Sequence, residues 1–236
     1  MEHNELSEFE PAPVLEIMKD LPLGPSHIDV GRMAVQYFDK AQGEGLSLEE
    51  YVTQELDYLI DSAHRPVDQP VDVVLYGFGR IGRLMARILI AKTDGGDSLR
   101  LRAVVVRKGG AENDLVKRAS LLRRDSVHGA FKGTIRVDEE RQSFVANGNE
   151  VRMIYASSPE EVDYTAYGIN NCIVVDNTGI WRDRQGLSKH LSSKGVSKVI
   201  LTAPGKGDVK NIVAGINDHE IEESDALISA ASCTTN

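Results

Sequence analysis

The feature that most constrains the fold is a glycine-rich turn between an apolar run and an apolar helical pattern. The apolar run covers residues 71–76, and the turn that follows it reads Gly77-Phe78-Gly79-Arg80-Ile81-Gly82. The spacing fits G-x-G-x-x-G, which is weak alone but specific when a strand precedes it and a helix follows it. The first glycine permits the tight bend, the second lets the backbone approach a pyrophosphate, and the third lets the helix pack on the strand. We therefore predict a dinucleotide site at Gly77, Gly79 and Gly82, with N–H groups of the helix N-terminus facing the phosphates.

Strands and helices alternate after this turn. We expect helices over residues 80–92 and 112–124, and strands over residues 71–76, 101–106, 172–176, 198–202, 212–216 and 226–230. Residues 131–156 read as antiparallel strands, in which Asn147-Gly148 is a hairpin turn signal. Alternation of this kind is typical of a mostly parallel sheet covered by helices. Residues 67–236 are thus predicted to form an α/β domain of the Rossmann type with an antiparallel hairpin insertion.

Residues 1–66 differ from the rest in pattern and charge, and they predict an α-helical extension. They hold 14 of the 36 acidic residues but only 4 of the 27 basic ones. Three amphipathic helices are expected, and Ser47 with Glu50 forms a capping box at the start of the third. Such an extension either packs on its own chain or on a neighbouring subunit, or it serves as a docking or regulatory element.

Composition excludes several classes of protein. With 41% hydrophobic residues and no apolar run of about 18 residues, we expect a globular chain and no membrane partner. The acidic N-terminal segment makes nucleic acid a poor partner, because phosphate binding needs basic charge. Two cysteines in 236 residues and the lack of a secretory signal predict a cytoplasmic location. No residues are singled out as metal ligands.

The residues that follow the second strand predict the choice of cofactor. An Asp or Glu at this point accepts the ribose hydroxyls of NAD and repels the 2′-phosphate of NADP. This chain has Arg107 and Lys108 instead, and their cations can pair with that phosphate. A solvated basic loop without a ligand is the alternative interpretation. We therefore predict the use of NADP, or of NADP and NAD alike.

A cysteine after the last apolar run is the candidate nucleophile. The run over residues 226–230 leads into Ser232, Cys233 and Thr234. Active groups gather at the carboxyl ends of strands in α/β sheets, and a cysteine at a helix N-terminus is a stronger nucleophile. Cys172 lies in a predicted buried strand and reads as a core residue. On this spacing alone, a catalytic and a structural role for Cys233 are both open.

Residues 71–236 resemble the N-terminal, NAD(P)-binding half of phosphorylating glyceraldehyde-3-phosphate dehydrogenases. The shared signatures occur in the order of that family. They are Gly77-Phe78-Gly79-Arg80-Ile81-Gly82-Arg83, Arg124-Asp125-Ser126-Val127-His128-Gly129, Asn147-Gly148-Asn149, Asn177-Thr178-Gly179, Thr202-Ala203-Pro204, Gly215-Ile216-Asn217 and Ser232-Cys233-Thr234-Thr235-Asn236. The last run alone is nearly specific for the family.

The resemblance implies a role for each matching residue. Arg80 and Ile81 contact the pyrophosphate through their backbone, and Thr178, Gly179 and Thr202 line the pocket toward the nicotinamide. Cys233 attacks the aldehyde of glyceraldehyde 3-phosphate, and Ser232 and Thr234 flank the substrate. A hydride then passes to the nicotinamide, and inorganic phosphate converts the resulting thioester to an acyl phosphate. The implied setting is glycolysis or gluconeogenesis, in a cytoplasmic homotetramer.

Two departures from the family pattern qualify this expectation. The usual acidic ribose residue aligns with Lys108, which again favours NADP. In the family the base that activates the cysteine lies beyond the Cys-Thr-Thr-Asn motif, whereas every histidine here precedes Cys233. The chain is therefore expected to be a fragment that is inactive alone and lacks the second, catalytic domain. Alternatives are an erythrose-4-phosphate dehydrogenase, and a nucleotide-binding or regulatory module without catalysis.

Overall fold

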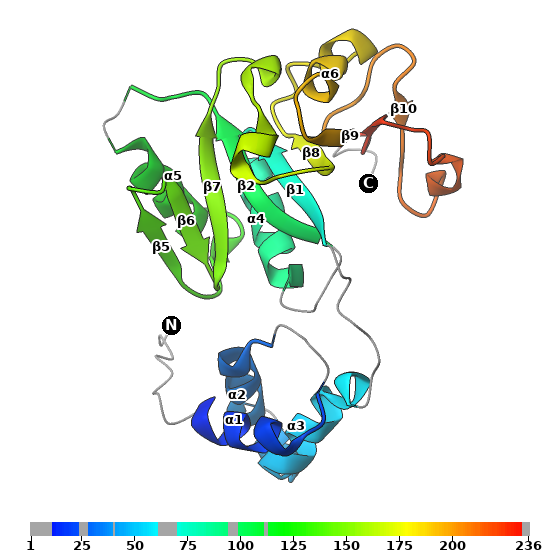
Figure 1. The fold of residues 1–236 in the computed structure, drawn as a ribbon. Coiled ribbons are helices and arrows are strands. Elements are labelled where there is room, and N and C mark those ends of the chain that lie inside the picture. The colour runs from blue at the N-terminus through cyan, green and yellow to red at the C-terminus, as the bar shows by residue number, and fades with distance from the viewer. Residues whose placement is uncertain are drawn as a thin grey trace. The chain divides into compact units, whose positions relative to one another are not determined.

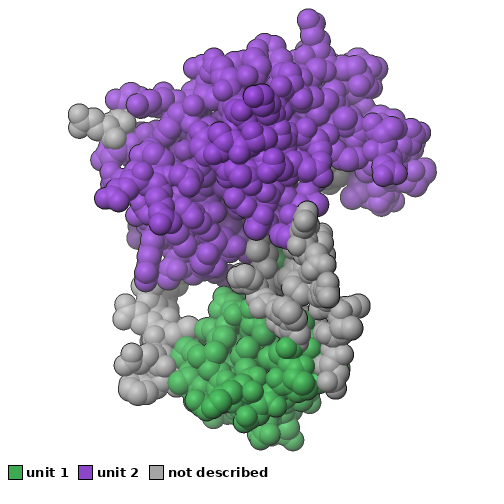
Figure 2. All heavy atoms as spheres, in the orientation of Figure 1, with its two compact units in different colours: residues 1–69, 92–98 green, residues 70–91, 99–236 purple. Residues whose placement is uncertain are grey.

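A computed structural model describes residues 11–23, 28–39, 41–60, 70–93, 99–110 and 113–232. The chain divides into two compact units, one of residues 1–69 with 92–98 and one of residues 70–91 with 99–236 (Figure 2). Each unit has its own cluster of buried hydrophobic residues. In the described part of the chain, no helix is both long and apolar enough to cross a membrane.

The first unit is a small helical body. It contains α1 (Pro11–Asp20), α2 (Val30–Asp39) and α3 (Leu48–Glu55), with 3-10 turns η1 (Ala41–Glu44) and η2 (Asp57–Leu59). The predicted capping box is confirmed, because the Glu50 amide donates to Ser47 Oγ at 3.2 Å and the Ser47 amide donates to Glu50 Oε2 at 3.0 Å. The helices meet over a shared core of Val14, Met33, Ala34, Tyr37, Ala41, Tyr51, Val52, Leu56 and Leu59. The N-terminal segment thus buries apolar side chains against itself.

The second unit is built on one large sheet (Figure 1). Its strands are β1 (Val71–Tyr76), β2 (Leu99–Val106), β5 (Ile135–Asp138), β6 (Ser143–Ala146), β7 (Asn149–Tyr155), β8 (Cys172–Asp176), β9 (Val196–Leu201), β10 (Lys210–Asn211) and β11 (Leu227–Ser229). Their order is β10-β11-β9-β8-β1-β2-β7-β6-β5. Every pairing from β10 to β7 is parallel, and β5, β6 and β7 pair antiparallel. The predicted Rossmann-type sheet with an antiparallel insertion is confirmed.

Helices and short turns join these strands. They are α4 (Arg80–Thr93), α5 (Asp114–Arg123) and α6 (Arg184–Leu191), and the 3-10 turns η3 (Pro159–Glu161), η4 (Tyr164–Tyr167) and η5 (Asp218–Glu220). A separate hairpin pairs two short strands, β3 (Arg124–Asp125) and β4 (Gly129–Ala130). The strand order reverses around β1, with β2 on one side and β8 on the other. Ligands of open α/β sheets bind outside the carboxyl ends of the strands at such a reversal.

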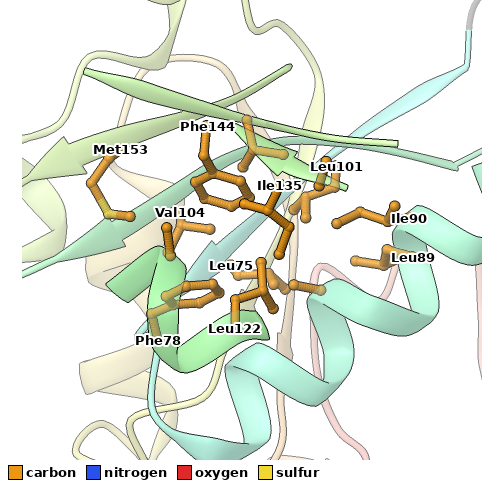
Figure 3. Packing of buried hydrophobic residues seen from close by; sticks show 14 of the residues in the cluster. Leu75, Phe78, Leu89, Ile90, Leu101, Val104, Leu122, Ile135, Phe144 and Met153 are labelled. Atoms are coloured by element: carbon orange, nitrogen blue, oxygen red, sulfur yellow. The ribbon is translucent and has the colours of Figure 1, made fainter. Parts of the chain in front are cut away.

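The sheet is buried on both faces, as the side chains of β1 illustrate. Val73 and Leu75 join one buried cluster, whereas Val74 and Tyr76 join another, as the two-residue period of a strand requires. Figure 3 shows the first cluster, in which Leu89 and Ile90 of α4 lie over the strands. Its central rings are those of Phe78 and Phe144, stacked with centroids 6.1 Å apart. Since Phe78 belongs to the glycine turn, this core also supports the turn.

The structure confirms the hairpin turn predicted at Asn147-Gly148, but the strand predicted over residues 212–216 is wrong. Asn147 and Gly148 both have positive φ, at 47° and 80°, and connect β6 to β7, as a type I′ turn requires. Residues 212–216 were expected to be a strand, yet they form turns after the short β10. The Asn217 side chain accepts from the Val213 amide at 2.8 Å and donates to the Asn211 carbonyl at 3.0 Å. These bonds hold the backbone in a compact loop that a strand could not form.

We expect Phe144→Ala to destabilise the second unit by about 3–5 kcal/mol, because Phe144 is fully buried and its removal leaves a cavity. Leu121→Ala is the matched control, since Leu121 is 44% exposed and should cost less than about 0.5 kcal/mol. Urea unfolding monitored by near-UV circular dichroism measures both. Equal losses in the two variants would contradict the assigned core.

Candidate functional site

The glycine turn joins β1 to α4 with a spacing that only glycine allows. A Cβ on Gly82 would lie 2.3 Å from the Gly77 carbonyl oxygen, so the first turn of α4 rests directly on the bend. Gly77 has φ +94°, in the region that favours glycine. A Cβ on Gly79 meets nothing within 4 Å. The middle glycine therefore leaves its backbone open to a ligand, which is the cradle that a pyrophosphate needs.

A cleft of about 300 Å³ opens beside this turn. Its walls come from the carboxyl ends of β1 and β2, from the glycine turn, from α5 and from the loop after β8. The lining residues are Tyr76, Gly77, Phe78, Gly79, Val105, Val106, Arg107, Arg118, Thr178, Ile180 and Trp181. The cleft is lined mostly by apolar side chains with a few polar groups, as small-molecule sites usually are. It lies where the strand order reverses, the expected place for a dinucleotide.

The β2 side of the cleft is cationic. Arg107 and Lys108 follow β2 and are both exposed, and Arg107 lines the cleft. Arg118 of α5 joins them, because its Nη2 donates to the Arg107 carbonyl at 3.2 Å. Its Nε is paired with Asp114 Oδ2 at 2.6 Å, which holds the guanidinium in place. The described part of this wall thus offers cations where the adenosine ribose of a dinucleotide is expected.

The β8 side of the cleft is polar and tightly bonded. Thr178 lines the cleft, and its amide and hydroxyl both donate to Asp176 Oδ1 at 2.6 Å. Thr202, at the end of β9, donates from its amide and its hydroxyl to the Asp176 carbonyl, each at 3.0 Å. Burial and the charge of Asp176 raise the pKa of Tyr76, at the end of β1, to about 12. Gly179, with φ +65°, continues the bend.

The predicted nucleophile lies at the edge of what the structure describes. Cys233 and Thr234 lie outside the described residues, and Ser232 is the last described one. Strand β11 leads to them, and Ala231 has a positive φ of 57°, which costs free energy for a residue with a side chain. Cys172 is fully buried, as predicted, and burial raises the pKa of its thiol to about 12. Cys172 is therefore a core residue.

One known protein matches nearly the whole chain, and others match about 70% of it. The family described as "Glyceraldehyde 3-phosphate dehydrogenase, NAD binding domain" matches residues 71–184. A glyceraldehyde-3-phosphate dehydrogenase-like protein of Pseudomonas aeruginosa (strain UCBPP-PA14) is 58% identical over 232 residues, which are 98% of this chain and 50% of that protein. The chain belongs to the glyceraldehyde-3-phosphate dehydrogenase family.

More distant members agree with this assignment. Glyceraldehyde-3-phosphate dehydrogenase of Streptococcus pyogenes is 37% identical over 169 residues, or 70% of this chain and 46% of that enzyme. The enzyme of Zymomonas mobilis subsp. mobilis is 36% identical over 168 residues, with the same shares covered. The chain spans about half the length of the curated relatives it matches. The matched family is described as an NAD-binding domain, which supports a nicotinamide cofactor for this unit.

The structure of this family member brings together some predicted residues and adds others. Gly77, Gly79, Arg107 and Thr178 line the cleft. The other described residues that were predicted at the cofactor do not line it, and these are Arg80, Ile81, Gly82, Lys108, Gly179 and Thr202. Sequence reasoning missed Tyr76, Ile180, Trp181 and, above all, Arg118. The spacing of Arg118 four residues after Asp114, on the helix after the basic pair, was the available signal.

The two residues expected at the pyrophosphate begin α4. The backbone of Arg80 and Ile81 opens the helix, where N–H groups have no partner within the helix. The Arg80 side chain points to the β3–β4 hairpin, with Nη2 donating to Ser126 Oγ at 3.3 Å. Asp125 accepts from the His128 amide at 2.9 Å and contacts the His128 ring at 3.0 Å. His128 therefore shapes the hairpin that Arg80 contacts.

We expect Gly82→Ala to destabilise the second unit by about 1–3 kcal/mol, because its Cβ would press on the Gly77 carbonyl. Gly79→Ala is the matched control: its Cβ has open space, so its stability should stay within about 1 kcal/mol of the parent. Urea unfolding followed by the fluorescence of Trp181, the single tryptophan, reports on this unit. A Gly79→Ala chain less stable than Gly82→Ala would contradict the described packing.

Proposed function

We propose that residues 67–236 bind NADP, or NADP and NAD alike, as part of an oxidoreductase that oxidises a phosphorylated aldehyde, and that residues 1–66 form a helical extension to this domain. The observation that carries the proposal is the cleft at the glycine turn. It has an open backbone at Gly79, cations on its β2 side and a bonded polar loop on its β8 side. Family membership supports the reaction class.

In the proposed complex, this chain's own groups hold and orient the cofactor. The amides at Gly79, Arg80 and Ile81 receive the pyrophosphate, and the helix N-terminus favours its negative charge. Arg107, with Lys108 and Arg118 beside it, pairs with a 2′-phosphate. When bound, the nicotinamide accepts a hydride from the substrate.

The proposed chemistry depends on Cys233. Its thiolate attacks the aldehyde carbon of glyceraldehyde 3-phosphate, forming a carbon–sulfur bond while Ser232 and Thr234 flank the substrate. The attack leaves the former aldehyde oxygen as an alkoxide, and transfer of a hydride from the same carbon to the cofactor would leave a neutral thioester. Inorganic phosphate then attacks the thioester carbon and expels the thiolate, which yields an acyl phosphate. A cytoplasmic homotetramer acting in glycolysis or gluconeogenesis is the setting that the family resemblance implies.

The choice of cofactor can be tested by quenching of Trp181 fluorescence, since Trp181 lines the cleft. We expect the dissociation constant for NADP to be equal to or lower than that for NAD. Arg107→Ala should weaken NADP about tenfold or more, because it removes a charge-assisted hydrogen bond of about 1.5–3 kcal/mol, and should leave NAD within about twofold. Lys194→Ala, at an exposed cation away from the cleft, is the control. A clear preference for NAD would contradict the proposal.

The nucleophile can be tested by alkylation of the native chain. At pH 7, iodoacetamide should modify Cys233 and leave Cys172 intact, since only thiolates react and Cys172 has a raised pKa and no exposure. Cys172 should react after unfolding in urea. Peptide mass spectrometry distinguishes the two sites. A Cys233 that reacts no faster than free cysteine would oppose an activated nucleophile.

A further inference from the structure

A buried ion-pair-like contact lies directly behind the cleft. His190 of α6 places Nε2 3.0 Å from Asp176 Oδ2, and both side chains are completely buried. A carboxylate is costly to bury unless hydrogen bonds compensate it. Neither residue lines the cleft, so neither can touch a ligand there. Their burial therefore needs a role other than direct binding.

Asp176 also forms hydrogen bonds with the loop that makes up one wall of the cleft. Its other oxygen, Oδ1, accepts from the amide and the hydroxyl of Thr178, both at 2.6 Å. The Thr178 hydroxyl oxygen in turn accepts from the Ile180 amide at 3.2 Å. The buried carboxylate of Asp176 thus holds both the backbone and the side chain of Thr178. Through the Thr178 hydroxyl it also holds the backbone at Ile180.

The fixed loop lies tightly against the glycine turn. A Cβ on Gly77 would lie 2.8 Å from Thr178 Cγ2, so the Thr178 methyl group occupies the space that the glycine leaves. Strand β8 lies on the opposite side of β1 from β2. A dinucleotide spans the reversal with its adenosine ribose at β2, so the Thr178 loop lies at the nicotinamide end.

His190 is itself held by aromatic rings. The Tyr76 ring meets it edge to face with centroids 4.7 Å apart, and the Trp181 ring does so at 5.6 Å. Among the described residues, none bonds to its Nδ1. A buried N–H without a partner costs more than a bare lone pair, so the arrangement favours the proton on Nε2, where it is donated to Asp176. The histidine therefore keeps Asp176 aimed at Thr178.

We propose that Asp176 and His190 are positioning residues that hold the Thr178 loop in the shape that receives the nicotinamide end of the cofactor. The inference rests on the proposed function, because it assumes that a nicotinamide dinucleotide occupies the cleft. Preordering the loop lowers the cost of binding, since the loop does not have to be ordered by the ligand.

The first test compares NADP with 2′-phospho-ADP-ribose, which is the same molecule without nicotinamide. In His190→Phe, which keeps a ring but loses the donor, calorimetry should show NADP binding about tenfold weaker, equivalent to about 1.4 kcal/mol. Binding of 2′-phospho-ADP-ribose should change less than about twofold. His190→Gln, whose amide can still donate to Asp176, should recover most of the loss. Equal weakening of both ligands, or unchanged NADP binding, would overturn the proposal.

A second measurement needs no ligand. In the ligand-free chain, amide hydrogen exchange at Thr178 should be about tenfold faster in His190→Phe than in the parent. Ser193→Ala is the matched control: Ser193 is buried near the same helix end, but its hydroxyl donates to the Pro159 carbonyl. It should leave exchange at Thr178 unchanged. Unchanged exchange in His190→Phe would overturn the positioning role.

The two tests separate the inference from the proposed function. A parent chain that bound neither ligand would contradict the proposed function, and the exchange rates would still decide whether the pair holds the loop. A parent chain that bound NADP, with a His190→Phe variant of unaltered affinity and exchange, would contradict the positioning role alone.

Discussion

The contact between Gly82 and the carbonyl of Gly77 is the constraint on which the site depends. Because a Cβ on Gly82 would lie 2.3 Å from that oxygen, α4 can start directly above the end of β1 only if this residue is glycine. The same bend is tied to β2, since the Gly77 amide donates to the Val105 carbonyl at 2.8 Å. On the β8 side, the methyl group of Thr178 lies 2.8 Å from where a Cβ on Gly77 would be. One turn therefore joins the two halves of the sheet at the point where the strand order reverses.

The two walls of the cleft differ in how they are built. On the β2 side, Arg107 supplies charge at the protein surface, where water competes for it and salt screens it, and the partly buried Arg118 lies beside it in a pair with Asp114. On the β8 side, Asp176 is buried and its bonds to Thr178 and His190 are shielded from solvent. We interpret the first wall as the part that selects the ligand by charge, and the second as the part that holds a fixed shape.

Local patterns predicted much of this fold, whereas contacts between distant residues did not follow from them. Strands 71–76 and 172–176 have the bounds expected from their apolar runs, because a parallel strand buried on both faces is mostly apolar, here with Asp72 and Asp176 as the exceptions. The strand expected over residues 212–216 failed because the side chain of Asn217 bonds the backbone into a loop, which no apolar pattern encodes. Arg118 and Trp181 line the cleft although they lie far along the chain from the glycine turn, so no local pattern predicts that they meet it. The role of Cys233 stays a prediction, as it lies outside the described residues.

We propose that the glycine turn and the Thr178 loop together bind a nicotinamide dinucleotide. Titration of the isotopically labelled chain with NADP, followed by the amide resonances of both segments, tests it most directly. We expect saturable shifts at Gly79, Arg80 and Ile81 and at Thr178, with a single dissociation constant for both segments. Saturable binding that left the amides of the glycine turn unmoved would contradict it.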